Sequence, residues 1–177
     1  MKFIALVPAK THSERCPNKN WRPFAGGPCL VDRAMHCAED VGLEWQIIGD
    51  GRTRDVLQYD VIQRPDWISD DTWDVVDWTM KIALQSDAVP VLLQPTSPFR
   101  TPQLVWACVR AYSISGAQRS FYHSYVRGPD NILTASGAVY VGTGIPVPAV
   151  HDPDPFDIDT EDDFLHAEEE WRKRGLK

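Results

Sequence analysis

Short apolar runs alternate with longer amphipathic or polar stretches along the 177-residue chain. The runs at 2–8 and 88–93 are nearly continuous, which is typical of strands buried on both faces of a parallel sheet. Between residues 30 and 41 apolar positions recur at helical spacing, and Gly42 is placed to end that helix. The other expected elements are strands at 45–49, 60–63, 118–125 and 137–141, and helices at about 71–86, 102–113 and 160–174.

The order of these elements predicts a three-layer α/β/α fold with a mainly parallel sheet. No internal repeat, low-complexity tract or linker divides the chain, so residues 1–177 are expected to form one domain. Ligands of such folds bind at the carboxyl ends of the strands. The polar loops after the first and fourth strands, residues 9–27 and 94–101, are therefore expected at the same edge of the sheet.

Composition and charge narrow the function classes. Hydrophobic residues make up 43% and charged residues 24% of the chain, which is ordinary for a globular protein. With 18 Lys and Arg against 25 Asp and Glu, the net charge of -7 argues against a nucleic-acid or anionic-membrane surface. It leaves room for a small basic pocket that binds a phosphorylated ligand.

The cysteines and the apolar runs indicate where the protein resides. The four cysteines, Cys16, Cys29, Cys37 and Cys108, form no C-x-x-C pair, so they are expected to be reduced thiols and not a disulfide framework. The N-terminal apolar run is too short for a signal peptide, and no stretch reaches the ~18 apolar residues of a membrane span. We therefore expect a soluble, cytoplasmic protein without membrane contacts.

The first polar loop has the groups that a triphosphate requires. Lys10, Arg15 and Lys19 supply positive charge, while Ser13 and Asn20 add hydrogen-bonding groups. Cations of this kind neutralise phosphate charge, and hydroxyl and backbone donors fix its oxygens. Composition alone supports a solvated basic loop equally well. The loop is neither a G-x-x-x-x-G-K-[ST] nor a G-x-G-x-x-G sequence, which disfavours those two nucleotide-binding classes.

Two further segments carry candidate chemistry. The 92–100 segment places an amide, two hydroxyls and a guanidinium at the end of a buried strand, a donor set that suits a carboxylate and hydroxyls. Asp157 and Asp159 are two residues apart, so both carboxylates point to one side of an extended chain and are suited to Mg²⁺ held jointly with phosphates. Thr160 with Asp163 forms a helix-capping pattern, and most of the other nearby acids are expected to be solvated.

These three segments resemble, in the same order, the acylneuraminate cytidylyltransferase (CMP-sialic acid synthetase) family. The 92–100 stretch, LLQPTSPFR, differs from the family's L-L-Q-P-T-S-P-L-R only at Phe99, and 157–163 is close to D-I-D-T-E-x-D. The opening motif is roughly P-A-R-G-G-S-K-R-x-P-x-K-N-x-x-P-F-x-G-x-P-L. The chain matches it at Pro8, Ala9, Ser13, Arg15, Pro17, Lys19, Asn20, Pro23, Phe24, Gly26 and Pro28.

The resemblance implies a Rossmann-like nucleotidyltransferase fold and a reaction. Family members transfer CMP from CTP to the anomeric hydroxyl of a sugar acid, with Mg²⁺ and release of pyrophosphate. By position, it assigns catalysis to Lys19, Asp159 and Arg15, and Mg²⁺ to Asp157 and Asp159. It assigns the nucleotide to Lys10, Ser13, Arg15, Lys19, Asn20, Arg64 and Thr72. It assigns the sugar acid to Gln94, Thr96, Ser97 and Arg100, with the 136–140 segment as a strand beside that pocket.

The chain also departs from the family. Lys10 stands for an arginine, Glu14 for a basic residue and Trp73 for a small residue. The family's dimerisation extension is cut down to about residues 116–135, so a homodimer is left open but not favoured. Two alternatives therefore remain: a nucleotidyltransferase of the same fold acting on another sugar or nucleotide, and a non-catalytic nucleotide- or sugar-binding module.

Overall fold

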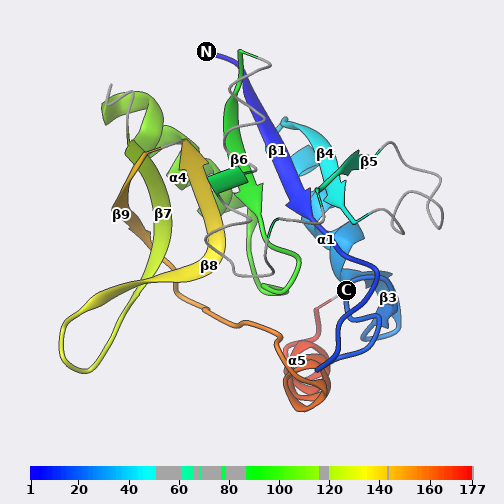
Figure 1. Ribbon diagram of the computed structural model, residues 1–177. Coiled ribbons are helices and arrows are strands. Elements are labelled where there is room, and N and C mark those ends of the chain that lie inside the picture. Colours follow the sequence, from blue (N-terminus) through cyan, green and yellow to red (C-terminus); the bar gives the residue numbers. More distant parts are fainter. Residues whose placement is uncertain are drawn as a thin grey trace.

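A seven-stranded sheet forms the centre of the protein. The computed structural model describes residues 1–50, 61–65, 68, 77–78, 87–115, 120–142 and 144–176 (Figure 1). The strands of the main sheet are β1 (Phe3–Pro8), β4 (Glu44–Gly49), β5 (Val61–Gln63), β6 (Val89–Leu93), β7 (Ser120–Arg127), β8 (Leu133–Gly142) and β9 (Ile145–His151). The described helices are α1 (Leu30–Asp40), α4 (Pro102–Ser115) and α5 (Glu161–Lys173).

The strand order is β5-β4-β1-β6-β8-β7-β9, and most neighbours run parallel. Among the described strands of this sheet, β8 is the one that runs against its neighbours, β6 and β7. From β1 the chain moves outward through β4 to β5 and then returns to β6 on the other side of β1. The direction in which successive strands are added therefore reverses between β1 and β6. Ligands of open α/β sheets bind at such a switch point. The predicted α/β class with a mainly parallel sheet is confirmed.

Side chains along the central strands point alternately to the two faces of the sheet, and each face has its own apolar core. Ala5 and Val7 of β1 face a core shared with α1 and α4, whereas Leu6 packs with Ile48 and Leu92 on the opposite face. These side chains are at most 2% exposed. Because both faces of the central strands are buried, their sequences are continuous apolar runs. The helix expected at about 71–86 lies almost wholly outside the described residues.

The loop after β1 contains a small hairpin that the sequence pattern did not predict. β2 (Pro23–Phe24) pairs with β3 (Gly27–Cys29), and the two-residue turn between them has a positive φ at Ala25 (52°) and Gly26 (78°). Two consecutive left-handed residues are characteristic of a type I′ hairpin turn. Phe24 is fully buried, so the hairpin anchors the far end of the polar loop.

Helix α5 lies beside this hairpin and away from the main sheet, next to the loop that leaves β1 (Figure 1). The predicted capping by Thr160 is confirmed, since its hydroxyl accepts a hydrogen bond from Asp163 N and the Asp163 carboxylate accepts from Thr160 N. Such a reciprocal cap satisfies backbone donors that the first helical turn leaves unpaired. The chain therefore turns sharply into α5 directly after the acidic segment.

All four cysteines are free and buried, as expected for reduced thiols. Among the described residues, no helix combines the length and the apolar character that a membrane span requires.

Candidate active site

A cavity of about 460 Å³ opens at the carboxyl edge of the parallel strands. Segments that follow β1, β4, β5 and β6 all contribute to it, as does the acidic segment before α5. Pro8 of β1 is level with Ile48 of β4, so the polar loops leave the sheet at the same height. The lining residues are Pro8, Ala9, Lys10, His12, Ser13, Glu14, Arg15, Lys19, Asn20, Ile48, Gly49, Asp50, Arg64, Gln94, Pro95, Thr96, Asp157 and Asp159.

Lys19 is a buried cation in the wall of this cavity, only 7% exposed. Its ammonium donates a 2.5 Å hydrogen bond to the carbonyl oxygen of Ile158 and lies 3.7 Å from Asp159 Oδ1. Burial lowers the pKa of Lys19, and the carboxylates of Asp159 and Asp157 oppose that shift. The ammonium is thus held in one place, with little water around it, where a phosphate oxygen would gain from its charge.

The position of Ile158 explains why Asp157 and Asp159 both face the cavity. Its side chain is fully buried, and its N–H donates to Thr96 O at 2.9 Å while its carbonyl accepts from Lys19. In an extended segment neighbouring side chains point to opposite sides. With Ile158 directed into the protein, Asp157 and Asp159 are directed into the cavity, as the sequence spacing predicted.

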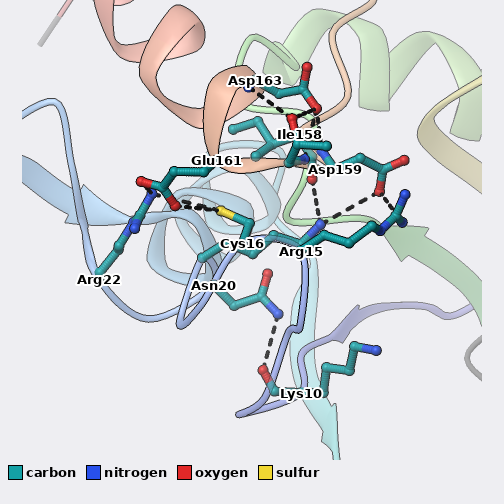
Figure 2. Close-up of polar contacts among 11 residues, drawn as sticks. Lys10, Arg15, Cys16, Asn20, Arg22, Ile158, Asp159, Glu161 and Asp163 are labelled. Atoms are coloured by element: carbon teal, nitrogen blue, oxygen red, sulfur yellow. Dashed lines mark hydrogen bonds and ion pairs between the residues drawn. The ribbon is translucent and has the colours of Figure 1, made fainter.

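Asp159 is the counter-ion of the basic loop after β1 (Figure 2). Its Oδ1 accepts a hydrogen bond from Arg15 Nη2 at 3.0 Å, and the Lys19 ammonium approaches the same oxygen. Both Arg15 and Asp159 remain substantially exposed. The ion pair is therefore accessible to competing ligands.

Asp157 lies on the cavity wall beside the loop after β6. The protein around it removes part of the hydration of its carboxylate, although the residue stays open to the cavity, and this raises its pKa. A hydrogen bond from the Thr96 hydroxyl counters the shift, and the nearby Asp159 carboxylate adds to it. A cation placed between these two carboxylates would relieve the repulsion.

The donor set satisfies part of what a hard metal ion needs. Two carboxylates project from one extended segment into a polar cavity, which suits Mg²⁺ bound jointly with substrate phosphates. Within the described part of the chain, no group of three or more His, Cys, Asp or Glu side chains could hold a metal alone. A metal at this site would depend on oxygens supplied by a substrate.

The loop after β6 has some side chains that line the cavity and others that lie behind them. Gln94 and Thr96 line the cavity, whereas Ser97 is buried and does not. Gly137 of β8 crosses close to this loop with φ 86°, where an added Cβ would lie 3.7 Å from Gln94 Oε1. Its backbone conformation favours glycine, whereas the space beside the loop would accept a Cβ at ordinary contact distance.

Arg100 is partly buried beneath the same loop. Its Nη1 donates to Gln94 O at 2.6 Å and to Ala138 O at 3.2 Å, and it also bonds the Cys37 thiol. Burial lowers its pKa, and Cys37 is the main group that opposes this shift. The guanidinium thus ties the loop to β8 and is absent from the cavity lining.

The structure adds one acid that the sequence interpretation missed. Asp50 follows β4, and its carboxylate accepts hydrogen bonds from Thr11 N at 3.1 Å and from the Thr11 hydroxyl at 3.1 Å. This connection fixes the start of the first loop to the neighbouring strand. The signal was available, because a polar residue directly after a parallel strand belongs to the ligand-binding edge.

The predicted site residues are largely gathered in this one cavity. Lys10, Ser13, Arg15, Lys19, Asn20, Arg64, Gln94, Thr96, Asp157 and Asp159 all line it. Asn20 donates from Nδ2 to Lys10 O at 3.2 Å, and its buried Oδ1 has no hydrogen-bond partner among the described residues. Ser97 and Arg100 lie behind the lining, and Thr72 is outside the described residues.

Known proteins of similar sequence or fold include CMP-sugar synthetases and a cytidylyltransferase. No protein-family model matches the chain. CMP-N,N'-diacetyllegionaminic acid synthase of Legionella pneumophila is 28% identical over 129 residues, covering 66% of this chain and 55% of that protein. The chain therefore spans about half the length of this curated relative.

The similar solved structures include CMP:2-keto-3-deoxy-manno-octonic acid synthetase complexed with CTP. It superposes with a TM-score of 0.73 at 13% identity, and the match covers 98% of this chain and 100% of that chain. A cytidylyltransferase of Leptospira borgpetersenii gives TM-score 0.70 at 12% identity, covering 98% and 88%. Rv0371c of Mycobacterium tuberculosis gives 0.63 at 16%, covering 95% and 97%. At these identities the structures show the fold, and with the sequence relative they confirm the resemblance drawn from the motifs.

Proposed function

We propose that this chain, a relative of the CMP-sugar cytidylyltransferases, transfers CMP from CTP to the anomeric hydroxyl of a sialic-acid-like sugar acid and releases pyrophosphate. The observation that carries the proposal is the meeting of three groups in one cavity: the basic loop after β1, the Gln94–Thr96 loop after β6, and the Asp157–Asp159 pair. A cation-rich loop, a sugar-type donor loop and two hard carboxylates are the parts that such a transfer requires.

The loop after β1 supplies the triphosphate site in this proposal. Lys19 provides a buried charge and Arg15 an exposed one, while Lys10 and Ser13 line the same cavity. Positive charges held in place before the reaction stabilise the charge that develops on the phosphates, and each such donor is worth roughly 10²- to 10³-fold in rate. Asn20 and Arg64 contact the nucleoside, and Thr72 stays a proposed neighbour of it.

The loop after β6 supplies the sugar-acid site. Gln94 and Thr96 present an amide and a hydroxyl to the same cavity as the basic loop. Ser97 and Arg100 support these two residues from behind, since Arg100 fixes the Gln94 carbonyl. The sugar would lie between this loop and the α-phosphate.

The reaction itself is an in-line displacement. The anomeric oxygen forms a bond to the α-phosphorus as the bond to the bridging oxygen of pyrophosphate breaks, and the hydroxyl proton is released to water. Positioning and charge neutralisation therefore account for catalysis. Bound Mg²⁺ would neutralise phosphate charge and orient the phosphate oxygens. Asp157 and Asp159 are the residues that would hold it, with substrate oxygens completing the coordination.

The experiment is a pyrophosphate-release assay with purified protein and Mg²⁺. Each of the four NTPs is paired with a panel of eight- and nine-carbon 2-keto sugar acids that includes diacetyllegionaminic acid. Release that needs both CTP and a sugar acid supports the proposal. Preference for another nucleotide would replace the CMP part of the proposal, and turnover of another sugar class would replace the acceptor.

A matched pair of variants separates an enzyme from a binding module. Asp157→Asn combined with Asp159→Asn should abolish turnover. Asp162→Asn should leave it unchanged, because Asp162 belongs to the same acidic segment but is exposed and outside the cavity. CTP binding without turnover in the unmodified protein would instead support the non-catalytic module.

A further inference from the structure

The carboxylate pair of the cavity is attached to the protein through a separate apolar cluster. Ile158 is buried together with Cys16, Phe24, Leu30, Phe99, Phe164 and Ala167, with Phe156 and Trp171 packed against them. This cluster is distinct from the two cores of the main sheet. The placement of the carboxylates therefore depends on how α5 packs, since the acidic segment leads directly into that helix.

Trp171 is the α5 residue that connects this cluster to both substrate loops. Its ring packs edge-on against Phe24 of the hairpin, with centroids 5.6 Å apart, and stacks on Phe99 of the loop after β6 at 5.8 Å. The Arg33 guanidinium covers the same indole at 4.1 Å. Phe164, Ala167 and Trp171 follow helical spacing, so they form one apolar face of α5.

Charged contacts align α5 on the same hairpin. Glu161 accepts from Arg22 Nη2 at 2.8 Å (Figure 2), and Glu168 accepts from Ala25 N at 2.6 Å. Ala25 has a positive φ, and its N–H is the group that Glu168 contacts. The helix is thereby fixed along its length against the segment that continues from Lys19.

We infer that Trp171 is a positioning residue for the proposed reaction: by packing between Phe24 and Phe99 it fixes α5, and so holds Asp157 and Asp159 at the cavity. Trp171 does not line the cavity and lies 11 residues beyond Thr160, about 16 Å along the helix axis. It therefore acts on the carboxylates through Ile158 and α5 and not by touching a substrate. The inference rests on the proposed function for its effect on catalysis, but its structural part can be tested separately.

The test compares Trp171→Ala with Trp106→Ala. Trp106 is a matched control, because it is a helical tryptophan covered by Arg110 but is 52% exposed on α4 and outside the cavity. In Trp171→Ala we expect the Mg²⁺ concentration for half-maximal turnover to rise roughly 10- to 100-fold, the range for groups that orient metal ligands indirectly. Trp171→Phe should recover most of the loss, since a phenyl ring can still pack between the two phenylalanines.

Hydrogen exchange gives a readout that needs no turnover. The Ile158 amide, which donates to Thr96 O, should exchange faster in Trp171→Ala while amides of β1 and β6 keep their protection. If the Ile158 amide exchanges faster in Trp171→Ala but the unmodified protein does not turn over CTP, Trp171 still positions the acidic segment. The proposed function is then rejected. An unchanged Ile158 amide and unchanged Mg²⁺ dependence, or faster exchange throughout β1 and β6, would overturn the inference. Trp171→Phe supplies the same comparison if the alanine variant does not fold.

Discussion

Arg15 Nη2 lies 3.0 Å from Asp159 Oδ1, so a cation proposed for phosphate and a carboxylate proposed for metal neutralise each other across the cavity. Lys19 approaches the same oxygen at 3.7 Å. A nucleotide that engages Arg15 would free Asp159 for a metal ion, and a metal ion on Asp159 would free Arg15 for phosphate. Metal and CTP are thus expected to strengthen each other's binding, with equal coupling in both directions.

The first prediction concerns Arg15→Met. Exposed ion pairs are worth about 0.2–1 kcal/mol, so removing this one should tighten Mn²⁺ binding without nucleotide by about 1.4- to 5-fold. The same change should weaken CTP binding, because a phosphate contact is lost. Titration of Mn²⁺ by electron paramagnetic resonance and calorimetric titration of CTP check both parts.

Lys2→Met is the control for that prediction. It removes an equally exposed ion pair, with Glu44 at 2.8 Å, at the end of β1 that lies away from the cavity. Neither Mn²⁺ nor CTP binding should change. If Arg15→Met does not change the Mn²⁺ affinity measured in the absence of nucleotide, Arg15 and the metal do not compete for Asp159.

The second prediction is that Asp157→Asn stabilises the protein while it removes activity. The pKa of Asp157 is raised in the fold above its ordinary value of 3.8. The folded state therefore binds the proton more tightly than the unfolded state, and stability falls as the pH rises between these two pKa values. At neutral pH the ionised carboxylate is a net cost, which the uncharged amide avoids.

Urea unfolding as a function of pH tests this directly. The free energy of unfolding of Asp157→Asn should exceed that of the unmodified protein at pH 7. The difference should shrink as the pH falls through the raised pKa of the folded state and be lost below pH 3.8, where the unfolded-state carboxyl is protonated as well. Asp162→Asn, on the same segment but exposed, should show no such pH-dependent gain. A variant that is less stable at pH 7 would mean that the attraction of the Asp157 carboxylate to Lys19 outweighs its partial loss of hydration.

The parts of the fold that the sequence predicted are those with a strong local pattern. The runs that became β1 and β6 are apolar because both faces are buried, and α1 repeats at helical spacing up to Gly42, which has a positive φ of 74°. The pairing of Asp157 with Asp159 followed from alternation alone. These features depend on neighbours in the chain, so a single sequence is enough to find them.

Features that depend on tertiary contacts were missed or placed differently. The Ala25 turn has no glycine at its first position and keeps its backbone conformation beside Glu168, a residue far away in the sequence. β9 contains Pro146 and Pro148, which argue against a strand, yet it lies at the sheet edge where a missing N–H costs little. Arg100 belongs to a family motif, but only the structure shows that its guanidinium is bonded to backbone carbonyls beneath the loop.

The third prediction is that Lys19 cannot be replaced by arginine. The ammonium occupies a closed position between Ile158 O and Asp159, and a larger planar guanidinium does not fit that geometry. Lys19→Arg and Lys19→Met should both lower kcat/KM for CTP by at least ~10²-fold. Steady-state kinetics with the accepted sugar acid measures this, and Lys173→Arg on the exposed face of α5 is the control. Near-normal turnover of Lys19→Arg would show that charge alone suffices.

The last prediction distinguishes two roles for Arg100. If it bound the sugar carboxylate directly, Arg100→Met would raise KM for the sugar acid and leave stability nearly unchanged. The structure instead directs Nη1 to the carbonyls of Gln94 and Ala138, which the variant would leave without these donors. The free energy of unfolding should then fall by about 1–3 kcal/mol, the cost of unsatisfied buried polar groups.

Urea unfolding and steady-state kinetics of Arg100→Met together decide between these roles. Arg110→Met, an arginine over the exposed Trp106, should change neither quantity. Because the loop after β6 is fixed by the buried guanidinium, we expect kcat to fall together with stability as Gln94 and Thr96 lose their alignment. An Arg100→Met protein of normal stability with a raised KM for the sugar acid would show that the cavity opens to reach this arginine when substrate binds.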